Sequence, residues 1–513
     1  MDPSEDQSEI FAFLADPATH ALAGVVTRIE THGAVVFLAG RDVYKVKRAI
    51  RFPFMDFSTL EKRRAACENE IAVNKFNAPD LYLGTLPIRR AGRRLTIDGT
   101  DGDIVEWMVH LRRFDETQTL DRLAERGELD LAIAAQLAEI IFAAHQHAPR
   151  RIAGGTDDFR RRLEDTIFGL AEAEDVFAPA AVVALRARFL AAYEAHESLL
   201  RAREAQGKVR RCHGDVHLRN IVREEGRPVL FDAIEFDDAL ATIDILYDLA
   251  FVLMDLWQRG FHDHANLLLN RYLWSSPESE IEGLAALPLF LALRAAIRAR
   301  VTTALAKLEP AAKETRASEA RQFFAAAEDF LAPHAPRLVG IGGLSGSGKS
   351  TLAQALAAQV GRAPGALHLR SDIERKKLAG VGDIERLPAE AYRPEMSNKI
   401  YQILRERAET ALRAGQSVIV DAVHARPEER DTLADVAARC KAPFTGIWLD
   451  VPVEMLVARV EARQNDASDA TPAVVREQTG FDLGRLDWTR LDASRPIAAL
   501  LKDALRYIAD RPS

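Results

Sequence analysis

One short segment in the second half of the chain constrains the fold more than any other. Gly343–Ser350 reads Gly-Leu-Ser-Gly-Ser-Gly-Lys-Ser and fits the pattern GxxxxGK[ST] in full. An apolar stretch, Leu338–Ile341, precedes it, and an Ala- and Leu-rich stretch, Leu352–Val360, follows it. A strand, a glycine-rich loop and a helix in this order make a phosphate-binding loop, so the sequence predicts a parallel α/β domain here.

Each part of this loop has a predicted role. Glycines allow backbone N–H groups to surround phosphate oxygens, and the helix N-terminus adds partial positive charge. We expect Lys349 to reach the β- and γ-phosphates of ATP and Ser350 to bind Mg²⁺. The predicted nucleotide-binding residues are Gly343, Ser345, Gly346, Ser347, Gly348, Lys349, Ser350 and Thr351.

Charged residues follow two further strands expected in this half of the chain. Leu367–Leu369 reads as a strand, and Asp372 comes shortly after it. Ser417–Val420 is apolar and β-branched, and it ends in Asp421. The carboxylate of Asp421 is a candidate for the Mg²⁺ shell, because Mg²⁺ prefers oxygen ligands.

The C-terminal half resembles the small P-loop kinases that phosphorylate metabolites, nucleosides or polynucleotide 5′-ends. The resemblance implies that Asp372 accepts the proton of the acceptor hydroxyl and that Arg375 binds the substrate. A helix is expected after the strand Ile447–Asp450, and it carries Arg459 and Arg463 one turn apart on one face. In the resemblance these are lid arginines that close over the transferring phosphate.

Other readings of the same residues stay open. Asp372 suits the N-cap of a helix, and the arginine pair suits a solvated helix face. The pattern of Asp372 and Arg375 also allows a kinase that acts on nucleic-acid ends. A formal net charge of -8 argues against that reading, because non-specific nucleic-acid binding uses a basic surface.

A second constellation lies near the middle of the chain. His213-Gly-Asp215 is followed by Asn220, and a short apolar strand further on ends in Asp232. The pattern H-x-D-x-x-x-x-N with a later Asp is the catalytic arrangement of kinase-fold phosphotransferases. Asp215 is the candidate base, Asn220 and Asp232 are candidate Mg²⁺ ligands, and His213 is expected to hold the loop.

The N-terminal segment offers the lysine and glutamate that such a site needs. Val43–Arg48 reads as a strand whose alternation puts Lys45 and Lys47 on one face. One lysine is expected to pair with the α- and β-phosphates and with a glutamate of the following helix. We favour Lys45 with Glu70; Lys47 and Glu68 are the alternatives.

These motifs resemble the aminoglycoside phosphotransferase family and its choline-kinase-like and fructosamine-kinase-like relatives. The resemblance rests on H-G-D-x-H-x-x-N, on F-D-x-I-E-F, and on Asp244 and Asp248, and it runs over about residues 24–265. It implies a bilobal kinase fold, ATP and Mg²⁺. The glycine-rich loop of protein kinases is missing, because the hairpin at Thr31-His32-Gly33 holds a single glycine.

The sequence is too long for one hydrophobic core, so we expect several domains. The fold class is α/β and α+β multidomain, with a bilobal protein-kinase-like fold followed by a P-loop NTPase fold with a parallel sheet. The predicted parts are an N-terminal leader (1–23), a kinase-like N-lobe (24–115), a helical C-lobe with the catalytic loop (116–331), a linker (332–337) and a P-loop kinase domain (338–513).

As a whole, the chain resembles bacterial fusions of an aminoglycoside-phosphotransferase-like domain with a zeta-toxin-like or polynucleotide-kinase-like, AAA-type P-loop domain. The resemblance implies a bifunctional ATP-dependent phosphotransferase that acts on hydroxyl groups of small molecules. One active kinase with the other domain as a nucleotide-binding regulator is the alternative. The acceptors and the oligomeric state are left open by the sequence.

The compartment is predicted from what the sequence contains. Cys67, Cys212 and Cys440 lie far apart and form no metal or disulfide pattern, which favours a reducing environment. The N-terminus has neither the basic nor the apolar region of a signal peptide, and no apolar run approaches a membrane span. We therefore expect a cytoplasmic protein without membrane contact.

Overall fold

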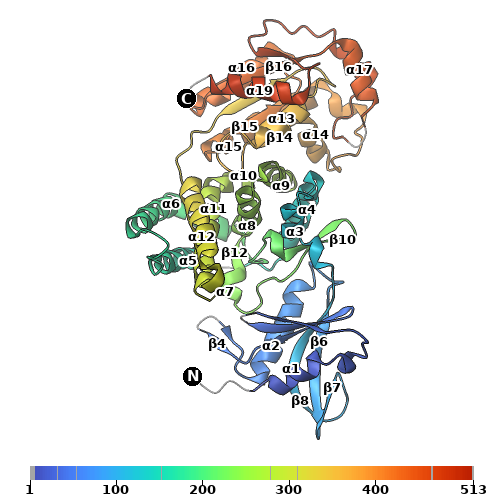
Figure 1. Ribbon diagram of the computed structural model, residues 1–513. Coiled ribbons are helices and arrows are strands. Elements are labelled where there is room, and N and C mark those ends of the chain that lie inside the picture. Colours follow the sequence, from blue (N-terminus) through green and yellow to red (C-terminus); the bar gives the residue numbers. More distant parts are fainter. Residues whose placement is uncertain are drawn as a thin grey trace. The chain divides into compact units, whose positions relative to one another are not determined.

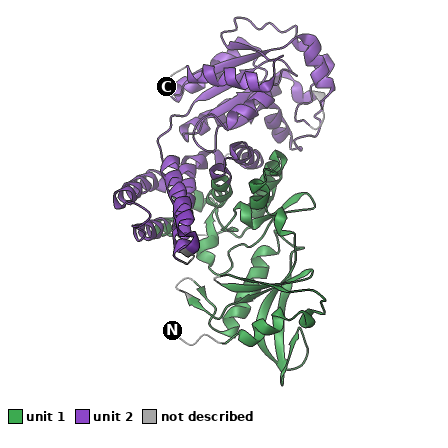
Figure 2. Cartoon of the chain, viewed as in Figure 1, with its two compact units in different colours: residues 1–162, 201–255 green, residues 163–200, 256–513 purple. Residues whose placement is uncertain are grey.

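The computed structural model describes residues 6–31, 33–52, 55–151, 153–277, 279–308, 310–463 and 466–510. His32, in the expected hairpin turn, lies outside these residues. The chain forms two compact units, the first made of residues 1–162 and 201–255 and the second of residues 163–200 and 256–513 (Figure 2). The second unit thus combines helices that precede residue 332 with the P-loop region, and the predicted domain boundaries stay a prediction.

The first unit contains a six-stranded antiparallel sheet in the order β1-β2-β3-β8-β6-β7 (Figure 1). Helix α2 (Leu60–Asn74) packs against it, and its N-cap Thr59 accepts a hydrogen bond from the Lys62 amide. The strands are β1 (Thr27–Glu30), β2 (Ala34–Ala39), β3 (Asp42–Lys47), β6 (Tyr82–Ala91), β7 (Arg94–Ile97) and β8 (Asp103–Arg112), with a separate hairpin of β4 (Arg51–Phe52) and β5 (Met55–Asp56).

The segment predicted as a leader contains a helix that belongs to the core of this unit. Helix α1 (Ser8–Ala15) buries Ile10 and Leu14 against Phe37 and Val46 of the sheet. Six consecutive apolar residues, Ile10–Ala15, make up most of this short helix, and we did not predict it as an element. Burial of its apolar side shows that it helps to stabilise the sheet.

The catalytic loop of the first unit lies between short strands. Strand β10 begins directly after Asn220, and β11 ends two residues before Asp232, so their hairpin places both residues at one end. The remaining elements of this unit are α3 (Leu120–Glu125), α4 (Leu131–His147), β9 (Val209–Arg211), β10 (Ile221–Glu224), β11 (Arg227–Leu230), α7 (Asp238–Ala241) and β12 (Thr242–Asp244); α5 (Gly155–Ala171), α6 (Pro179–Ala205) and α8 (Ile245–Gln258) continue across the division between the units.

The P-loop region forms a five-stranded parallel sheet in the order β14-β15-β13-β16-β17. Every residue of β13 is buried, as expected for a strand covered on both faces. The prediction of a P-loop NTPase fold with a parallel sheet is confirmed. The strands are β13 (Leu338–Gly342), β14 (Leu367–Arg370), β15 (Val418–Asp421), β16 (Phe444–Asp450) and β17 (Thr489–Asp492).

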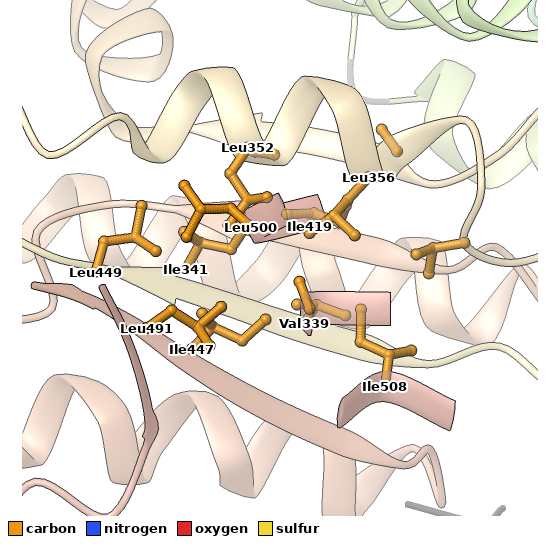
Figure 3. Close-up of a cluster of buried hydrophobic side chains, with 14 of the residues drawn as sticks. Val339, Ile341, Leu352, Leu356, Ile419, Ile447, Leu449, Leu491, Leu500 and Ile508 are labelled. Carbon is orange, nitrogen blue, oxygen red and sulfur yellow. The ribbon is translucent and has the colours of Figure 1, made fainter. Parts of the chain in front are cut away.

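The core of this domain lies between the sheet and two helices. Figure 3 shows Leu352 and Leu356 of α13 meeting Ile341 of β13 and Ile419 of β15, with Leu500 of α19 beside them. Helix α13 begins at Lys349 itself, three residues earlier than predicted. The helices of this domain are α13 (Lys349–Ala357), α14 (Ser371–Ala379), α15 (Pro394–Arg413), α16 (Pro427–Arg439), α17 (Val453–Glu461), α18 (Pro472–Gln478) and α19 (Ile497–Ala509).

Further helices complete the second unit. Helices α11 and α12 pack along each other, and Phe177 stacks on Phe324 of α12. The helices are α9 (His262–Ser275), α10 (Ser279–Gly283), α11 (Leu287–Leu308) and α12 (Lys313–Phe330). Within the described ranges, no helix combines the length and the apolar composition that a membrane crossing needs.

Helix α9 contacts the P-loop sheet through amide side chains. Asn270 accepts a 2.7 Å hydrogen bond from the His368 backbone N–H and donates one of 3.2 Å to the Ala366 carbonyl. Asn266 donates to the same carbonyl at 3.0 Å, and Trp274 Nε1 donates to the His368 carbonyl at 3.2 Å. Both backbone groups of His368 in β14 are therefore bonded to α9.

Two candidate active sites

The first site is built around Lys45 of β3. Its Nζ lies 2.9 Å from Glu70 Oε1 on α2 and 2.9 Å from Asp232 Oδ1, so the favoured lysine and glutamate meet one of the predicted metal ligands. Burial alone would lower the pKa of Lys45, but Asp232 and Glu70 outweigh it and hold that pKa well above its ordinary value. Lys45 likewise lowers the pKa of Asp232, although burial opposes this.

The alternative residues have different surroundings. Lys47 Nζ lies 2.5 Å from Glu70 Oε2 and also pairs with Glu235, and only 1% of its side chain is exposed. Both lysines therefore share Glu70, as their common strand face predicts. Glu68 is exposed and pairs with Arg64 on the surface of α2, so it does not reach the site.

The catalytic loop brings the predicted base and one predicted metal ligand together. Asn220 Nδ2 donates to Asp215 Oδ2 at 2.9 Å, and His217 Nε2 lies 3.3 Å from the same oxygen. His213 accepts from the Asp215 backbone N–H, and its Nε2 lies 3.0 Å from the Phe231 carbonyl. Burial lowers the pKa of His213, so its neutral ring can join the loop to the strand that precedes Asp232.

Buried residues support this loop from behind. Asp248 accepts a 2.9 Å hydrogen bond from the Gly214 N–H, and Asp255 accepts one of 2.9 Å from the Leu218 N–H. Tyr82 Oη accepts a 3.0 Å hydrogen bond from the Asp232 N–H. Asp232 has φ of +60°, a left-handed conformation that is uncommon for residues other than glycine and is often found at functional sites. Asp255 and Tyr82 were not predicted, because they lie far from the motif in sequence.

The phosphate-binding loop precedes α13 in the second unit. Gly346 and Gly348 have φ of +85° and +92°, and a Cβ on Gly346 would lie 2.7 Å from the Leu456 carbonyl oxygen. These positions therefore require glycine. The side chain of Lys349 donates to the Leu344 carbonyl at 3.0 Å, and the Ser345 N–H donates to Gln478 Oε1 at 2.8 Å.

The other predicted loop residues differ in burial. Gly343 is buried with φ of +140°, and Ser347 Oγ is buried without a hydrogen-bond partner among the described residues. Thr351, in the first turn of α13, is exposed. A buried hydroxyl inside a glycine-rich loop fits a ligand that supplies the missing acceptor or donor.

The two predicted metal ligands of this domain are in direct contact. Ser350 Oγ donates to Asp421 Oδ2 at 2.6 Å, and the same oxygen lies 3.3 Å from His368 Nε2 and 3.8 Å from Arg370 Nε. His368 and Arg370 come from β14, the strand beside β15 in the sheet. Neither was predicted as a site residue, although Arg370 stands at the carboxyl end of a parallel strand, where ligands usually bind.

Helix α14 carries the predicted acceptor-side residues. Its N-cap is Arg370 and its first residue is Ser371, so the alternative reading of Asp372 as the N-cap is wrong. Burial raises the pKa of Asp372; the charge of Arg370 opposes this and that of Asp421 adds to it. Arg375, one turn further along, is 8% exposed, and its guanidinium lies over the Tyr392 ring at 4.8 Å.

The two predicted lid arginines have separate positions. Helix α17 ends at Glu461, so Arg463 lies beyond the helix and the expectation of one shared helix face is wrong. Arg459 donates to the Ala493 carbonyl at 2.9 Å and contacts the Ser347 carbonyl at 3.5 Å, beside the phosphate-binding loop. Arg463 Nε lies 3.5 Å from Asp466 Oδ2.

Comparison with protein families assigns both halves. Residues 64–279 match the phosphotransferase enzyme family known as APH, and residues 338–481 match an AAA domain. The chain therefore joins an APH phosphotransferase domain to a P-loop domain of the AAA_33 kind, as the resemblance predicted. It is an enzyme of the kinase or phosphotransferase class.

Two relatives share this organisation along most of their length. They are uncharacterized proteins of Mycobacterium tuberculosis (strain ATCC 25618 / H37Rv) and Mycobacterium bovis (strain ATCC BAA-935 / AF2122/97). Each is 28% identical over 481 residues, which covers 91% of this chain and 92% of the relative. The chain is thus similar to proteins in which both halves are also fused.

Solved structures resemble parts of the chain. A sugar kinase from Janibacter sp. HTCC2649 is 23% identical, with a TM-score of 0.26, and the match covers 34% of this chain and 95% of that one. A choline/ethanolamine kinase family protein from Mesorhizobium loti is 16% identical, with a TM-score of 0.36, and the match covers 63% and 98%.

Proposed function

We propose that this protein is a bifunctional ATP-dependent phosphotransferase. Each module transfers the γ-phosphoryl group of ATP to a hydroxyl of a small molecule. The acceptor of the N-terminal module is a sugar, an amino sugar or an aminoglycoside-like compound. The acceptor of the C-terminal module is a metabolite, a nucleoside or a 5′-hydroxyl end. The observation that carries the proposal is that residues predicted from separate motifs contact one another in each unit. In the first unit these contacts are Lys45 with Glu70 and Asp232, and Asp215 with Asn220; in the second, Ser350 contacts Asp421.

In the N-terminal module, Asp215 is the proposed base. Its carboxylate takes the proton of the acceptor hydroxyl while the oxygen attacks the γ-phosphorus. Asn220 holds the carboxylate by a 2.9 Å hydrogen bond, which fixes its direction. Lys45 is proposed to bind the α- and β-phosphates, and Glu70 holds its ammonium group in place.

In the C-terminal module, Asp372 has the corresponding role. Its raised pKa makes it a stronger base than an ordinary aspartate. Lys349 is proposed to bind the β- and γ-phosphates from the loop, and the lid residues Arg459 and Arg463 to stabilise charge on the transferring group. Arg375 is proposed to bind the acceptor.

The residues of both sites fit Mg²⁺. Asn220 and Asp232 in one unit, and Ser350 and Asp421 in the other, offer the oxygen donors that this hard cation prefers. The bound ion would neutralise negative charge between the phosphate groups of ATP. None of the three cysteines, Cys67, Cys212 and Cys440, is in a disulfide bond, which supports the proposed cytoplasmic location.

A screen of acceptors with matched variants tests the proposal. The purified protein, Asp215→Ala and Lys349→Ala are each incubated with Mg²⁺-ATP and a pool of aminoglycosides, sugars, amino sugars, nucleosides and 5′-hydroxyl oligonucleotides. Mass spectrometry then identifies products that gain a phosphoryl group. Products lost only in Asp215→Ala belong to the N-terminal module, and those lost only in Lys349→Ala belong to the C-terminal module.

The screen also separates the alternative functions. If one variant removes every product, while ATP still binds to the other module, the protein is one kinase with a nucleotide-binding regulator. If only the oligonucleotide gains phosphate through Lys349, the C-terminal module is an end kinase. The absence of any product, with equal and low ATP turnover in all three proteins, would refute the kinase proposal.

A further inference from the structure

His368 is a buried histidine of β14 whose side chain contacts the proposed Mg²⁺ ligand Asp421. Only 5% of His368 is exposed, and its Nε2 lies 3.3 Å from Asp421 Oδ2. An ionised carboxylate can only accept hydrogen bonds, so Nε2 carries a proton and is the donor. Burial lowers the pKa of His368, although Asp421 opposes this, so the neutral ring predominates at neutral pH.

The contacts of the Asp421 carboxylate are concentrated on one of its oxygens. Among the described residues, Ser350 Oγ at 2.6 Å, His368 Nε2 at 3.3 Å and Arg370 Nε at 3.8 Å all approach Oδ2. A carboxylate that is held through one oxygen presents the other, here Oδ1, to a cation. Side chains that hydrogen-bond a metal-binding carboxylate fix its direction, and their loss usually weakens metal binding by about 10–100-fold.

Helix α9 in turn fixes the backbone of His368. Asn270 Oδ1 accepts from the His368 N–H at 2.7 Å, and Trp274 Nε1 donates to the His368 carbonyl at 3.2 Å. The Trp274 ring also meets the His368 ring edge-on, with 6.3 Å between the ring centroids. The peptide groups on both sides of the His368 Cα are therefore bound to one helix, which fixes the point from which the imidazole extends.

The helix that follows β14 is attached to α9 as well. Lys377 of α14 donates to the carbonyl of Ser276, the residue directly after α9, at 2.8 Å. Arg271 of α9 pairs with Asp383 at 2.7 Å. Strand β14 and the segment after it are therefore held by the same helix, and β14 cannot shift without the loss of buried hydrogen bonds.

Helix α9 and the strand that it holds belong to different family matches. Helix α9 lies within residues 64–279, which match the APH family, whereas β14 and Asp421 lie within residues 338–481, which match the AAA domain. Both lie in the second compact unit. A helix of the APH match therefore supports a proposed metal ligand of the P-loop domain.

We propose that His368 is a positioning residue for Asp421 and that α9 holds it there through Asn270 and Trp274. Binding of Mg²⁺ together with ATP in the C-terminal module thus depends on a helix of the APH half. This inference rests on the proposed kinase function of that module. It goes beyond that function, because it makes the fusion of the two halves a condition for metal binding.

Binding of Mn²⁺ to the full-length protein tests this without turnover. Mn²⁺ binds to the same oxygen ligands as Mg²⁺ and is detected by electron paramagnetic resonance. A non-hydrolysable ATP analogue is present, and only the site that Asp421→Asn removes is counted, which excludes the N-terminal module. We expect His368→Ala to lower the Mn²⁺ affinity of this site by about 10–100-fold. His368→Gln should recover part of the loss, because its amide N–H can replace the imidazole N–H.

Variants of α9 test the second step. Asn270→Ala and Trp274→Phe each remove one hydrogen bond to the His368 backbone and should lower the same affinity by a smaller factor. Asn266→Ala is the matched control, because Asn266 is also a buried amide of α9 but donates to backbone carbonyls that precede β14. We expect this control to lose stability and to keep the Mn²⁺ affinity. Thermal unfolding shows whether each variant is folded.

Each other outcome decides a separate point. An unchanged Mn²⁺ affinity in a folded His368→Ala would overturn the inference and leave the kinase function intact. A loss in His368→Ala, with none in Asn270→Ala and Trp274→Phe, would overturn the role of α9, and so would an equal loss in the Asn266→Ala control. Should His368→Ala not fold, wild-type affinity in both Asn270→Ala and Trp274→Phe overturns the inference. If binding of the ATP analogue does not depend on Lys349, the proposed function itself fails, and the inference fails with it.

Discussion

Ser350 Oγ donates a 2.6 Å hydrogen bond to Asp421 Oδ2 and so joins the first turn of α13 to the end of β15. Burial alone would raise the pKa of Asp421, but His368, Arg370 and Lys349 outweigh it and hold that pKa below its usual range. The carboxylate is therefore ionised at neutral pH. The hydroxyl and the carboxylate come from motifs far apart in sequence and meet where the P-loop helix begins.

Asp421→Asn should weaken the binding of Mg²⁺ in the C-terminal module. The amide keeps the shape but loses the negative charge, so we expect Mg²⁺ affinity to fall by about 10–100-fold. A Mg²⁺ titration of the Lys349-dependent activity measures this. Asp450→Asn is the control, since Asp450 ends the neighbouring strand β16 but pairs with Arg490 at the surface. Equal Mg²⁺ dependence in Asp421→Asn and the wild type would contradict the prediction.

The two lysines of β3 should differ in what their loss does. Lys47 is buried between Glu70 and Glu235, so Lys47→Met leaves buried charge unpaired and should lower the free energy of unfolding by about 3–5 kcal/mol. Lys45→Met should instead reduce the Asp215-dependent activity by about 10²–10³-fold, with a smaller loss of stability. Urea unfolding and product formation, measured on both variants, test this. The reverse pattern would assign the phosphate-binding role to Lys47.

Asp372→Asn should stabilise the protein at neutral pH while it abolishes transfer by the C-terminal module. The pKa of Asp372 is raised in the folded state by burial, so its contribution to stability is present at low pH and lost as pH rises through the raised value. Asparagine removes that cost, and the gain in Tm over the wild type should grow from mildly acidic to neutral pH. Thermal unfolding across this range measures it.

The activity should follow the same ionisation. Only the ionised carboxylate of Asp372 can accept a proton, so the Lys349-dependent kcat should fall with decreasing pH at values above the ordinary aspartate pKa of 3.8. A pH profile of the wild type, compared with one of the Asp215-dependent activity, tests this. For the stability prediction above, a Tm difference between Asp372→Asn and the wild type that shrinks towards neutral pH would show that Asp372 is not buried in the way described.

Asn270→Ala should destabilise the contact between α9 and β14. It leaves the His368 N–H and the Ala366 carbonyl with fewer partners, which should cost about 1–3 kcal/mol of unfolding free energy. Gln359→Ala serves as the control, because it removes an exposed amide just beyond α13 that donates to the Ala355 carbonyl at 3.4 Å. Denaturant unfolding of the full-length variants measures both. Equal stability of the two variants would contradict the prediction that the buried Asn270 amide stabilises this contact.

Local motifs explain why much of this arrangement was predictable. The P-loop and the segment from His213 to Asn220 are contiguous, so their strand–loop–helix context could be read from neighbouring residues. The pairing of Lys45 with Glu70 followed from strand alternation and from the helix that comes next. In these cases the residues that contact one another lie in elements that follow closely along the chain and that the sequence alone predicts.

The remainder depends on contacts between distant segments. The amides of α9 and the backbone of β14 are about a hundred residues apart, and nothing in either segment identifies the other. Asp255 has the same difficulty, since an aspartate on an apolar helix carries no sign that it accepts from the catalytic loop. Arg463 was misplaced because the end of α17 after Glu461 has neither a glycine nor a proline to mark it.

The hydrogen bonds from α9 to β14 also bear on how the protein can be divided. Strand β14 is the first strand of its sheet, and the backbone of its residue His368 bonds to Asn270 and Trp274 of α9. Asn266 bonds to the Ala366 carbonyl, directly before the strand. A P-loop domain expressed from the predicted linker (332–337) onward would expose these groups, and an unpaired strand edge recruits other chains. Fusion to the preceding helices thus acts as protection against self-association, and the smallest soluble fragment should begin before α9.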